Sequence, residues 1–290
     1  MEARPAHLMN SKVDSAIYHP IAQRHSRPGA NFHMAFMDVL EGISSVHVWS
    51  TLGWQDVKQR YRRSLLGPFW LTISTGLLLM VMGPLYGKLF NQDVSGYFLY
   101  LAVSFIAWQL LSSYISDACN AFIGAEGFIK QIRLPLSVYV MRLIWKNLIF
   151  FFHNLVFLVL VLAYFQPPLG FDLVLVPIGL FLFAVNALWI GIMLGFLSAR
   201  FRDIPQIINN LVQVFFFLTP VLWQPGMLGR HAWTVNLNPF YHFIEIIRTP
   251  LIGAPVNSLS WAAAAAITLA GFAVMAPFFA RYRARIAYWL

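Results

Sequence analysis

Long apolar runs, separated by short polar segments, occupy most of the chain after residue 66. A helix needs about 20 predominantly apolar residues to cross the hydrocarbon core of a membrane. Inside lipid, every backbone group has to hydrogen-bond within its own segment, so such runs form helices and not strands. We therefore predict an all-α integral membrane protein whose transmembrane domain covers residues 67–290. The six predicted transmembrane helices lie at residues 67–88, 97–118, 144–165, 173–199, 207–223 and 260–280, of which the fifth is short.

Two segments before the first span have different patterns. Residues 1–48 begin with scattered charges and several prolines, which bury too little surface to offset the cost of ordering, so we predict a mobile cytoplasmic tail. Residues 49–66 mix Trp54 and Val57 with basic side chains. This mixture is typical of an amphipathic helix that lies in the plane of the membrane interface.

The connection between the fifth and sixth spans is unusually long. Residues 224–259 include the moderately apolar stretch 239–253, which is too short to cross the membrane and is interrupted by Pro250. We predict a re-entrant or interfacial helical hairpin for this segment, because irregular backbone at membrane depth has to be enclosed by protein.

Composition agrees with a membrane protein. Hydrophobic residues make up 59% of the chain and charged residues only 11%, against roughly 25% charge in soluble domains. The net charge of +9 does not indicate a nucleic-acid partner, because the basic residues lie between apolar spans. The N-terminus lacks the apolar core of a signal peptide, so we expect the first span to act as the insertion signal. The single cysteine, Cys119, excludes an intrachain disulfide.

The distribution of basic residues predicts the orientation of the spans. All 20 lysines and arginines except Lys88, Arg230 and Arg248 fall on one side of the predicted membrane. Because cytoplasmic loops carry an excess of Lys and Arg, this side is expected to be cytoplasmic. We therefore predict that both termini are cytoplasmic.

The sequence offers little chemistry for an enzyme or a self-powered pump. The nearest approach to a phosphate-binding loop, residues 83–89, is one residue short and lacks the Ser or Thr that binds magnesium. His153 is the one ionisable candidate at mid-depth, and we expect it to hydrogen-bond a neighbouring helix rather than to relay protons. The 11 acidic residues are dispersed, without an Asp-x-Asp pair or a His-Glu-x-x-His motif. We expect no catalytic residue, no metal site and no cofactor in this chain.

Four segments, in this order along the chain, carry a family resemblance: LGWQDVKQRYRRSLLGPFW (52–70), GAEGFIKQIRLPLSVY (124–139), SARFRDIPQIINNLVQVFFFLTPVLW (198–223) and LNPFYHFIEIIRTPLIG (237–253). Together they resemble the permease subunits of ATP-binding-cassette (ABC) exporters for O-antigen, capsular polysaccharide or teichoic acid. The resemblance implies a homodimeric permease in the bacterial cytoplasmic (inner) membrane, paired with two copies of a separate ATPase that binds ATP and Mg. The implied substrate is a polysaccharide on a polyprenyl pyrophosphate. The alternatives are an ABC exporter of a drug or small lipid, and a membrane-embedded transferase of lipid-linked sugars.

The loop after the second span is a candidate for contact with the ATPase. The segment around Phe128 is short, partly basic and ends at Pro135, so a short docking helix is reasonable. In the resembling family this loop forms the coupling helix, through which the conformational change of the ATPase is transmitted to the permease. The resemblance gives that role to Glu126, Phe128, Lys130 and Arg133. The alternative is a solvated loop held by its positive charges.

Clustered arginines precede the first span. Arg60, Arg62 and Arg63 lead to Gly67, which turns the chain from the interface into the span. Guanidinium groups at a headgroup surface bind phosphate bidentately. We therefore propose that they attract the pyrophosphate of the lipid carrier, with topology setting and anionic-lipid binding as the alternative.

Polar and aromatic residues toward the end of the chain are candidates for a glycan path. Amides in the fifth span are costly when they face lipid, and aromatic rings stack on the apolar faces of sugars. The alternatives are helix-to-helix hydrogen bonds for the amides and an interfacial belt for the aromatics. The candidates are Asn209, Asn210, Gln213, Trp223, Phe240 and Tyr241.

Overall fold

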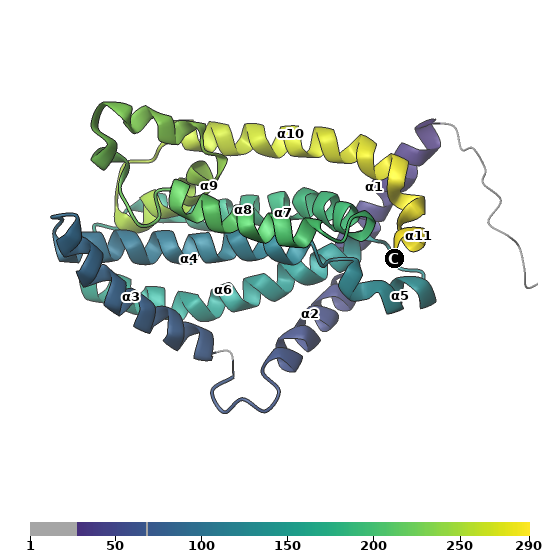
Figure 1. Ribbon diagram of the computed structural model, residues 1–290, viewed down its shortest axis with the longest axis horizontal. Helices are drawn as coiled ribbons and strands as arrows, with labels where there is room; N and C mark the ends of the chain where they lie inside the picture. Colours follow the sequence, from purple (N-terminus) through teal and green to yellow (C-terminus); the bar gives the residue numbers. More distant parts are fainter. Residues whose placement is uncertain (1–27, 68) are drawn as a thin grey trace, which may run out of the picture.

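The computed structural model describes residues 28–67 and 69–290, and this part of the chain is helical without any strand (Figure 1). Its α-helices are α1 (Pro28–Ser44), α2 (Val46–Arg60), α3 (Phe69–Leu89), α4 (Val94–Ala118), α5 (Glu126–Gln131), α6 (Ser137–Phe165), α7 (Leu175–Arg200), α8 (Ile204–Leu218), α9 (Pro239–Ile252), α10 (Ser258–Tyr282) and α11 (Ile286–Trp289). Short 3-10 segments are η2 (Ile123–Ala125), η3 (Phe171–Val174), η4 (Pro225–Leu237) and η5 (Arg283–Arg285).

Five helical segments are long and apolar enough to cross a membrane, which confirms the prediction of an all-α membrane protein. They are Phe69–Leu89, Val94–Ala118, Ser137–Phe165, Phe171–Arg200 and Ser258–Trp289. The central helix α4 packs against α3, α6, α7, α8 and α9. At one end of the bundle lie α1, α5, α11 and the C-terminus, and the connection between α3 and α4 lies at the opposite end (Figure 1).

The fifth predicted span corresponds to α8, which is shorter than expected. It ends at Leu218 instead of residue 223 and contains 15 residues. At about 1.5 Å per residue, α8 extends roughly 22 Å, less than the roughly 30 Å of hydrocarbon. The six-span count therefore stays a prediction for this helix.

The segment between α8 and α10 folds against the bundle. Most residues of α9 are buried, and the helix packs against α4, α7 and α10. Pro250 does not interrupt it, because α9 continues to Ile252 and ends where Gly253 adopts a left-handed conformation, with φ of 71°. The predicted re-entrant or interfacial position of this segment stays a prediction.

The structure differs from the expected mobile tail over residues 28–48, which form α1 and the first turn of α2. The buried carboxylate of Asp38 accepts hydrogen bonds from the backbone N–H groups of Leu136 (3.1 Å) and Ser137 (3.0 Å), and Arg283 Nε donates to it at 2.7 Å. Asp38 thus caps the start of α6 from another helix and ties α1 to the end of α10. The earlier part of the expected tail, and Pro68, lie outside the described residues.

The expected interface helix at residues 49–66 also has different limits, since α2 covers Val46–Arg60 and is followed by a turn. It packs against α6, where Trp49 meets Trp145 with ring centroids 5.8 Å apart. Arg142 of α6 binds Asp56 through Nε at 2.6 Å and Nη2 at 2.5 Å. This bidentate pair gives α2 a fixed attachment to the bundle.

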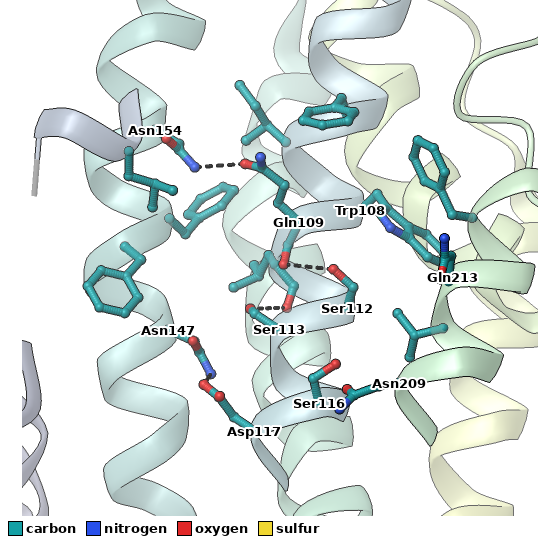
Figure 2. Close-up of a pocket in the computed structure, with 18 of the residues that line it drawn as sticks. Trp108, Gln109, Ser112, Ser113, Ser116, Asp117, Asn147, Asn154, Asn209 and Gln213 are labelled. Atoms are coloured by element: carbon teal, nitrogen blue, oxygen red, sulfur yellow. Dashed lines mark hydrogen bonds between the residues drawn. The ribbon is translucent and has the colours of Figure 1, made fainter. Parts of the chain in front are cut away.

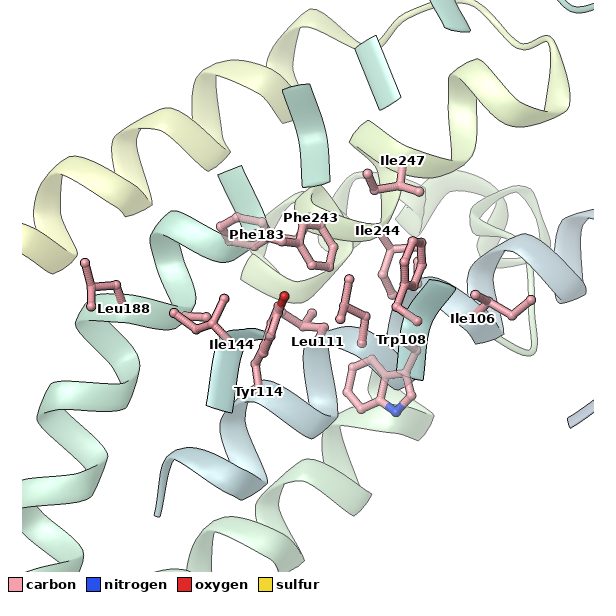
Figure 3. Packing of buried hydrophobic residues seen from close by; sticks show 14 of the residues in the cluster. Ile106, Trp108, Leu111, Tyr114, Ile144, Phe183, Leu188, Phe243, Ile244 and Ile247 are labelled. Carbon is pink, nitrogen blue, oxygen red and sulfur yellow. The ribbon is translucent and has the colours of Figure 1, made fainter. Parts of the chain in front are cut away.

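Close packing of apolar side chains joins α4, α6, α7 and α9 (Figure 3). Phe183 and Phe243 meet edge to face with ring centroids 5.6 Å apart. Small residues allow the helices to approach, as expected where lipid provides no hydrophobic driving force between helices. A Cβ atom on Gly271 would lie 2.2 Å from the ring of Trp189, so α7 and α10 can pack this closely only with glycine there.

The turn after α8 is held by polar side chains from α4 and α9. Tyr97 donates to the carbonyl oxygen of Leu222 at 2.5 Å, and Tyr100 donates to those of Pro220 and Trp223 at 2.8 and 3.0 Å. These bonds satisfy carbonyl groups of the turn, which have no partner within a helix.

Arg248 of α9 completes this arrangement. Its side chain is only 2% exposed; Nη1 donates to Ser104 Oγ at 3.0 Å and to the Pro220 carbonyl at 2.8 Å. Nη2 pairs with Glu245, and the guanidinium lies 4.3 Å from the ring centroid of Tyr100. From the sequence, Arg248 is one of three basic residues expected on the external side. Its spacing from Glu245 within an apolar stretch was the signal that could have identified the pair.

Candidate functional site

A cavity of about 590 Å³ lies among α2, α4, α6 and α8 (Figure 2). Most of its lining residues belong to helices that are expected to cross the membrane, yet many of them are polar. The polar lining residues are Arg60, Gln109, Ser112, Ser113, Ser116, Asp117, Asn147, Asn154, Asn209 and Gln213. We call this cavity the polar pocket.

Helix α4 contributes a polar stripe to the polar pocket. Gln109, Ser112, Ser113 and Ser116 are spaced three or four residues apart, so they share one face of the helix. Sequence reasoning missed this stripe, although its spacing was visible within the second predicted span. Ser112 and Ser113 donate to the Gln109 and Leu110 carbonyls of their own helix at 3.2 and 2.9 Å. Their oxygen atoms remain able to accept hydrogen bonds from a ligand.

A chain of amide hydrogen bonds crosses from α6 to α3 beside this stripe. Asn154 Nδ2 donates to Gln109 Oε1 at 2.8 Å (Figure 2). Gln109 Nε2 in turn donates to Thr75 Oγ1 at 3.2 Å. The buried Oδ1 atom of Asn154 has no hydrogen-bond partner among the described residues. A buried acceptor without a partner is costly, so this oxygen favours an incoming donor. The neighbouring His153 bonds to α3 through its backbone, since its carbonyl oxygen accepts a hydrogen bond from Thr72 Oγ1 at 2.8 Å. Its ring Nδ1 instead lies 2.7 Å from the Ile149 carbonyl of α6 itself.

One end of the polar pocket carries charges. The carboxylate of Asp117 accepts a hydrogen bond from Asn147 Nδ2 at 2.9 Å and pairs with Lys146 Nζ at 2.7 Å. Arg60 also lines the pocket, with its guanidinium carbon 4.9 Å from the ring centroid of Phe150. The carboxylate is thus neutralised, whereas the side chain of Arg60 has no carboxylate partner among residues 28–67 and 69–290.

Aromatic side chains form another part of the wall. Phe216 of α8 meets Phe105 and Trp108 of α4 with centroid distances of 6.1 and 5.7 Å. Phe240 of α9 meets Trp108 edge to face with ring centroids 5.8 Å apart, but it does not line the pocket. The polar pocket therefore offers both hydrogen-bonding groups and aromatic surface.

The candidates predicted for a glycan path separate into two groups. Asn209 and Gln213 line the polar pocket from one face of α8. Asn210 lies on another face, where it accepts a hydrogen bond from Gln206 at 3.3 Å. Trp223 and Tyr241 lie outside the pocket: the Trp223 indole donates to the Phe217 carbonyl at 3.0 Å, and buried Tyr241 lies beside Arg248. The predicted candidates do not include Trp108 or Phe216, two of the aromatic residues that line the pocket.

The predicted headgroup residues lie around the turn between α2 and α3. Arg62 and Arg63 are exposed and have no carboxylate partner in the described part of the chain. Arg63 and Gly67 both adopt left-handed conformations, with φ of 73° and 55°. Of this set, only Arg60 reaches the lining of the polar pocket.

The predicted coupling residues form the exposed helix α5 and the turn after it. Lys130 donates to Glu126 at 2.6 Å, and this hydrogen bond, together with the charge of Lys130, lowers the pKa of Glu126. Phe128 is 42% exposed, and Arg133 is exposed as well. An exposed apolar side chain flanked by charges at one end of the bundle is available to a partner protein.

Comparison with known proteins places the polar pocket in a matched region. The family described as ABC-2 type transporter matches residues 47–252. The chain is similar to the O-antigen export system permease protein RfbA of Myxococcus xanthus, with 28% identity over 189 residues, 64% of this chain and 72% of that protein. Two proteins of the same name from Klebsiella pneumoniae are 23% identical over 208 residues (70% of this chain, 79% of theirs) and 21% identical over 229 residues (76% and 87%).

Proposed function

This chain belongs to the ABC-2 type transporter family, and from that premise we propose that it is the permease subunit of an exporter for an O-antigen-like polysaccharide. Three relatives named as O-antigen export permeases support this substrate class over a drug or a small lipid. Membership in the family implies that an ABC ATPase subunit is the partner of this multi-pass membrane protein. In our proposal the ATPase binds ATP and Mg, and this chain needs no cofactor.

The observation that carries the proposal is the polar pocket inside an otherwise apolar bundle. Sugar hydroxyl groups both donate and accept hydrogen bonds, and the amides and serines of the pocket offer both kinds of partner. Trp108 and Phe216 supply surfaces on which the apolar faces of sugar rings can stack. We propose that the glycan passes along this wall, with Asn209 and Gln213 contributing from α8.

The arginines at the α2–α3 turn are suited to bind the pyrophosphate of the lipid carrier, the second part of the proposed substrate. We propose that Arg60, Arg62 and Arg63, at the turn that Gly67 completes, attract the pyrophosphate of a polyprenyl-linked glycan. Because Arg60 also lines the polar pocket, it connects the headgroup region to the glycan path. None of the three has a carboxylate partner among the described residues that would compete with phosphate.

The proposed assembly is a homodimer with two copies of the ATPase. No residue of α8 is buried in the single protomer, although the helix carries several amides. Amides are costly against lipid, so the amide-bearing surface of α8 is better suited to contact with a second protomer or with an aqueous path. In the same assembly, the ATPase contacts the permease at α5 and the turn after it, and its conformational change is transmitted there. The residues proposed for this contact are Glu126, Phe128, Lys130 and Arg133.

We propose that the protein lies in the bacterial inner membrane with both termini in the cytoplasm. The basic side chains of α2, of α5 and of the last turns of α7 and α10 support this orientation. The end of the bundle that carries α5 and α11 is then the cytoplasmic end.

Deletion of the gene tests the substrate class. We expect polysaccharide to accumulate in the cytoplasm and to disappear from the cell surface. Normal surface polysaccharide together with retention of a drug or a lipid would favour the alternative exporter. Purified protein is expected to hydrolyse no ATP and to transfer no labelled sugar to a lipid carrier; robust activity in either assay would contradict the proposed role.

A further inference from the structure

A second cavity, of about 370 Å³, lies where α7 and α10 end and α11 begins. It shares no lining residue with the polar pocket. Figure 1 shows α11 folded back from the end of α10 at the same end of the bundle as α5. The lining residues are Phe196, Leu197, Arg200, Phe201, Phe278, Tyr282, Arg285 and Trp289.

The inner walls of this cavity are aromatic. Phe278 lies 6.0 Å from Phe196 and 4.9 Å from Tyr282, and Trp289 lies 5.6 Å from Tyr282, all between ring centroids. Tyr and Trp side chains of this kind gather where a membrane-spanning helix reaches the headgroup layer. The walls therefore suit a ligand with an apolar part.

Two arginines accompany these rings. The guanidinium carbon of Arg200 lies 5.7 Å from the Trp289 ring centroid, and that of Arg285 lies 5.7 Å from the Tyr282 ring centroid. Within the described residues, neither side chain has a carboxylate within ion-pair distance or donates a hydrogen bond. The nearby Arg283, by contrast, is paired with Asp38. Arg200 and Arg285 are thus oriented by aromatic contacts while their N–H donors remain available.

We propose that this cavity binds an anionic phospholipid of the cytoplasmic leaflet, with its phosphate on Arg200 and Arg285 and the start of its acyl chains against the aromatic walls. Arginine binds phosphate bidentately, and basic pockets between transmembrane helices on the cytoplasmic side bind anionic headgroups. The aromatic lining favours a lipid over free phosphate, which offers these walls no apolar surface. The proposal rests on the orientation given above, and it is independent of the exported substrate.

Lipid binding is measured on the full-length purified chain in phosphatidylcholine nanodiscs that contain a small fraction of phosphatidylglycerol. We expect wild-type protein to retain phosphatidylglycerol in native mass spectra, and Arg200→Gln with Arg285→Gln to bind it about tenfold more weakly. The matched control is Arg202→Gln with Arg230→Gln, which removes the same charge from arginines that do not line the cavity. Gel filtration verifies that both variants are folded.

Tryptophan fluorescence locates the bound lipid. Phosphatidylglycerol with brominated acyl chains is expected to quench more emission than brominated phosphatidylcholine, and Trp289→Phe should remove that difference. Equal retention by wild type and the cavity variant, or equal quenching by the two lipids, would overturn the proposal. Displacement of the lipid by inorganic phosphate would assign the arginines to a soluble anion. If the cavity variant retains the lipid as wild type does but no longer stimulates the ATPase, the lipid site is refuted and the surface is assigned to contact with the ATPase.

The lipid-retention and fluorescence measurements need neither an exported glycan nor the ATPase. Lost lipid binding with normal export would therefore refute only the lipid site. Intact lipid binding in a protein that exports no polysaccharide would refute only the proposed function.

Discussion

The arginine of α9 and the arginines that follow α2 occupy opposite environments. Arg248 is 2% exposed and is engaged by Glu245, Ser104 and the Pro220 carbonyl. Arg62 and Arg63 are exposed, and no carboxylate in the described part of the chain pairs with them. Burying an arginine without partners is prohibitive, so the first site can exist only as a complete network. The second can keep its donors for a ligand because water or lipid headgroups solvate them.

This contrast separates a residue that holds the fold from residues that we propose bind the substrate. Arg248 holds the turn after α8, and α8 carries one wall of the polar pocket. Substitutions at Arg248 should therefore act on stability and, through it, on every activity. Substitutions at Arg62 and Arg63 should act on transport alone.

The largest effect on folding is expected for Arg248→Met. It leaves Glu245, whose side chain is 13% exposed, without its partner, and breaking a buried pair costs about 3–5 kcal/mol. The free energy of unfolding of the purified protein, measured by denaturation in mixed micelles, is the readout. Arg230→Met, at an exposed arginine of η4, is the control and should leave stability unchanged. If Arg248→Met with Glu245→Met is no more stable than the single variant, the unpaired carboxylate is not the cause.

The next effect separates transport from folding. Arg62→Glu with Arg63→Glu should change the free energy of unfolding by less than about 0.5 kcal/mol, because both side chains are exposed. The same double variant should abolish the appearance of glycan at the cell surface, since it replaces phosphate-binding charges by repelling ones. Surface staining with an antibody or lectin gives the readout, and Arg62→Lys with Arg63→Lys is the charge-preserving control. Normal export by the Glu variant would remove these arginines from the headgroup site.

A smaller effect is expected at the wall of the polar pocket. Asn209→Leu with Gln213→Leu removes amides that face the cavity, and a lost hydrogen bond is typically worth about 0.5–1.5 kcal/mol, or up to about tenfold in rate. We expect the rate of glycan export to fall by a factor within that range. Gln55→Leu with Gln59→Leu, at exposed glutamines one turn apart on α2, is the control. Equal export rates in the two double variants would exclude the pocket wall from the path.

The smallest effect on folding is expected at α5. Glu126→Gln breaks the exposed pair with Lys130, and exposed pairs contribute little to stability. Because Lys130 lowers the pKa of Glu126, any contribution is present at neutral pH and is lost as the pH falls through the lowered pKa. The thermal midpoint at neutral pH should not change measurably. Phe128→Ala should likewise preserve folding but reduce the ATPase activity of the assembled complex; an unchanged activity would count against coupling through α5.

Prediction from the sequence succeeded where a single segment determines its own structure. The spans at α3, α4, α7 and α10 were located because crossing lipid requires one continuous apolar helix. The amides of the fifth span were selected because amides are costly against lipid, and two of the three, Asn209 and Gln213, line the polar pocket. Sequence reasoning did not find the end of α8 at Leu218, which depends on Tyr97, Tyr100 and Arg248 satisfying the carbonyls of the following turn.

The candidate site itself depends on contacts between distant segments. Asn154 and Gln109 are 45 residues apart, and neither residue alone reveals that their amides form part of one wall. Asp38 and Arg283 are separated by 245 residues, so the docking of α1 could not be read from the polar composition around it.

The sequence by itself determined the membrane-spanning character of this protein, its family and the positions of the long helices, because lipid imposes local rules on composition and length. Only the tertiary structure decided which polar side chains form hydrogen bonds or ion pairs within the protein and which remain available to a ligand. That distinction depends on distances between helices, and it separates Arg248, which stabilises the bundle, from Arg60, which faces the polar pocket.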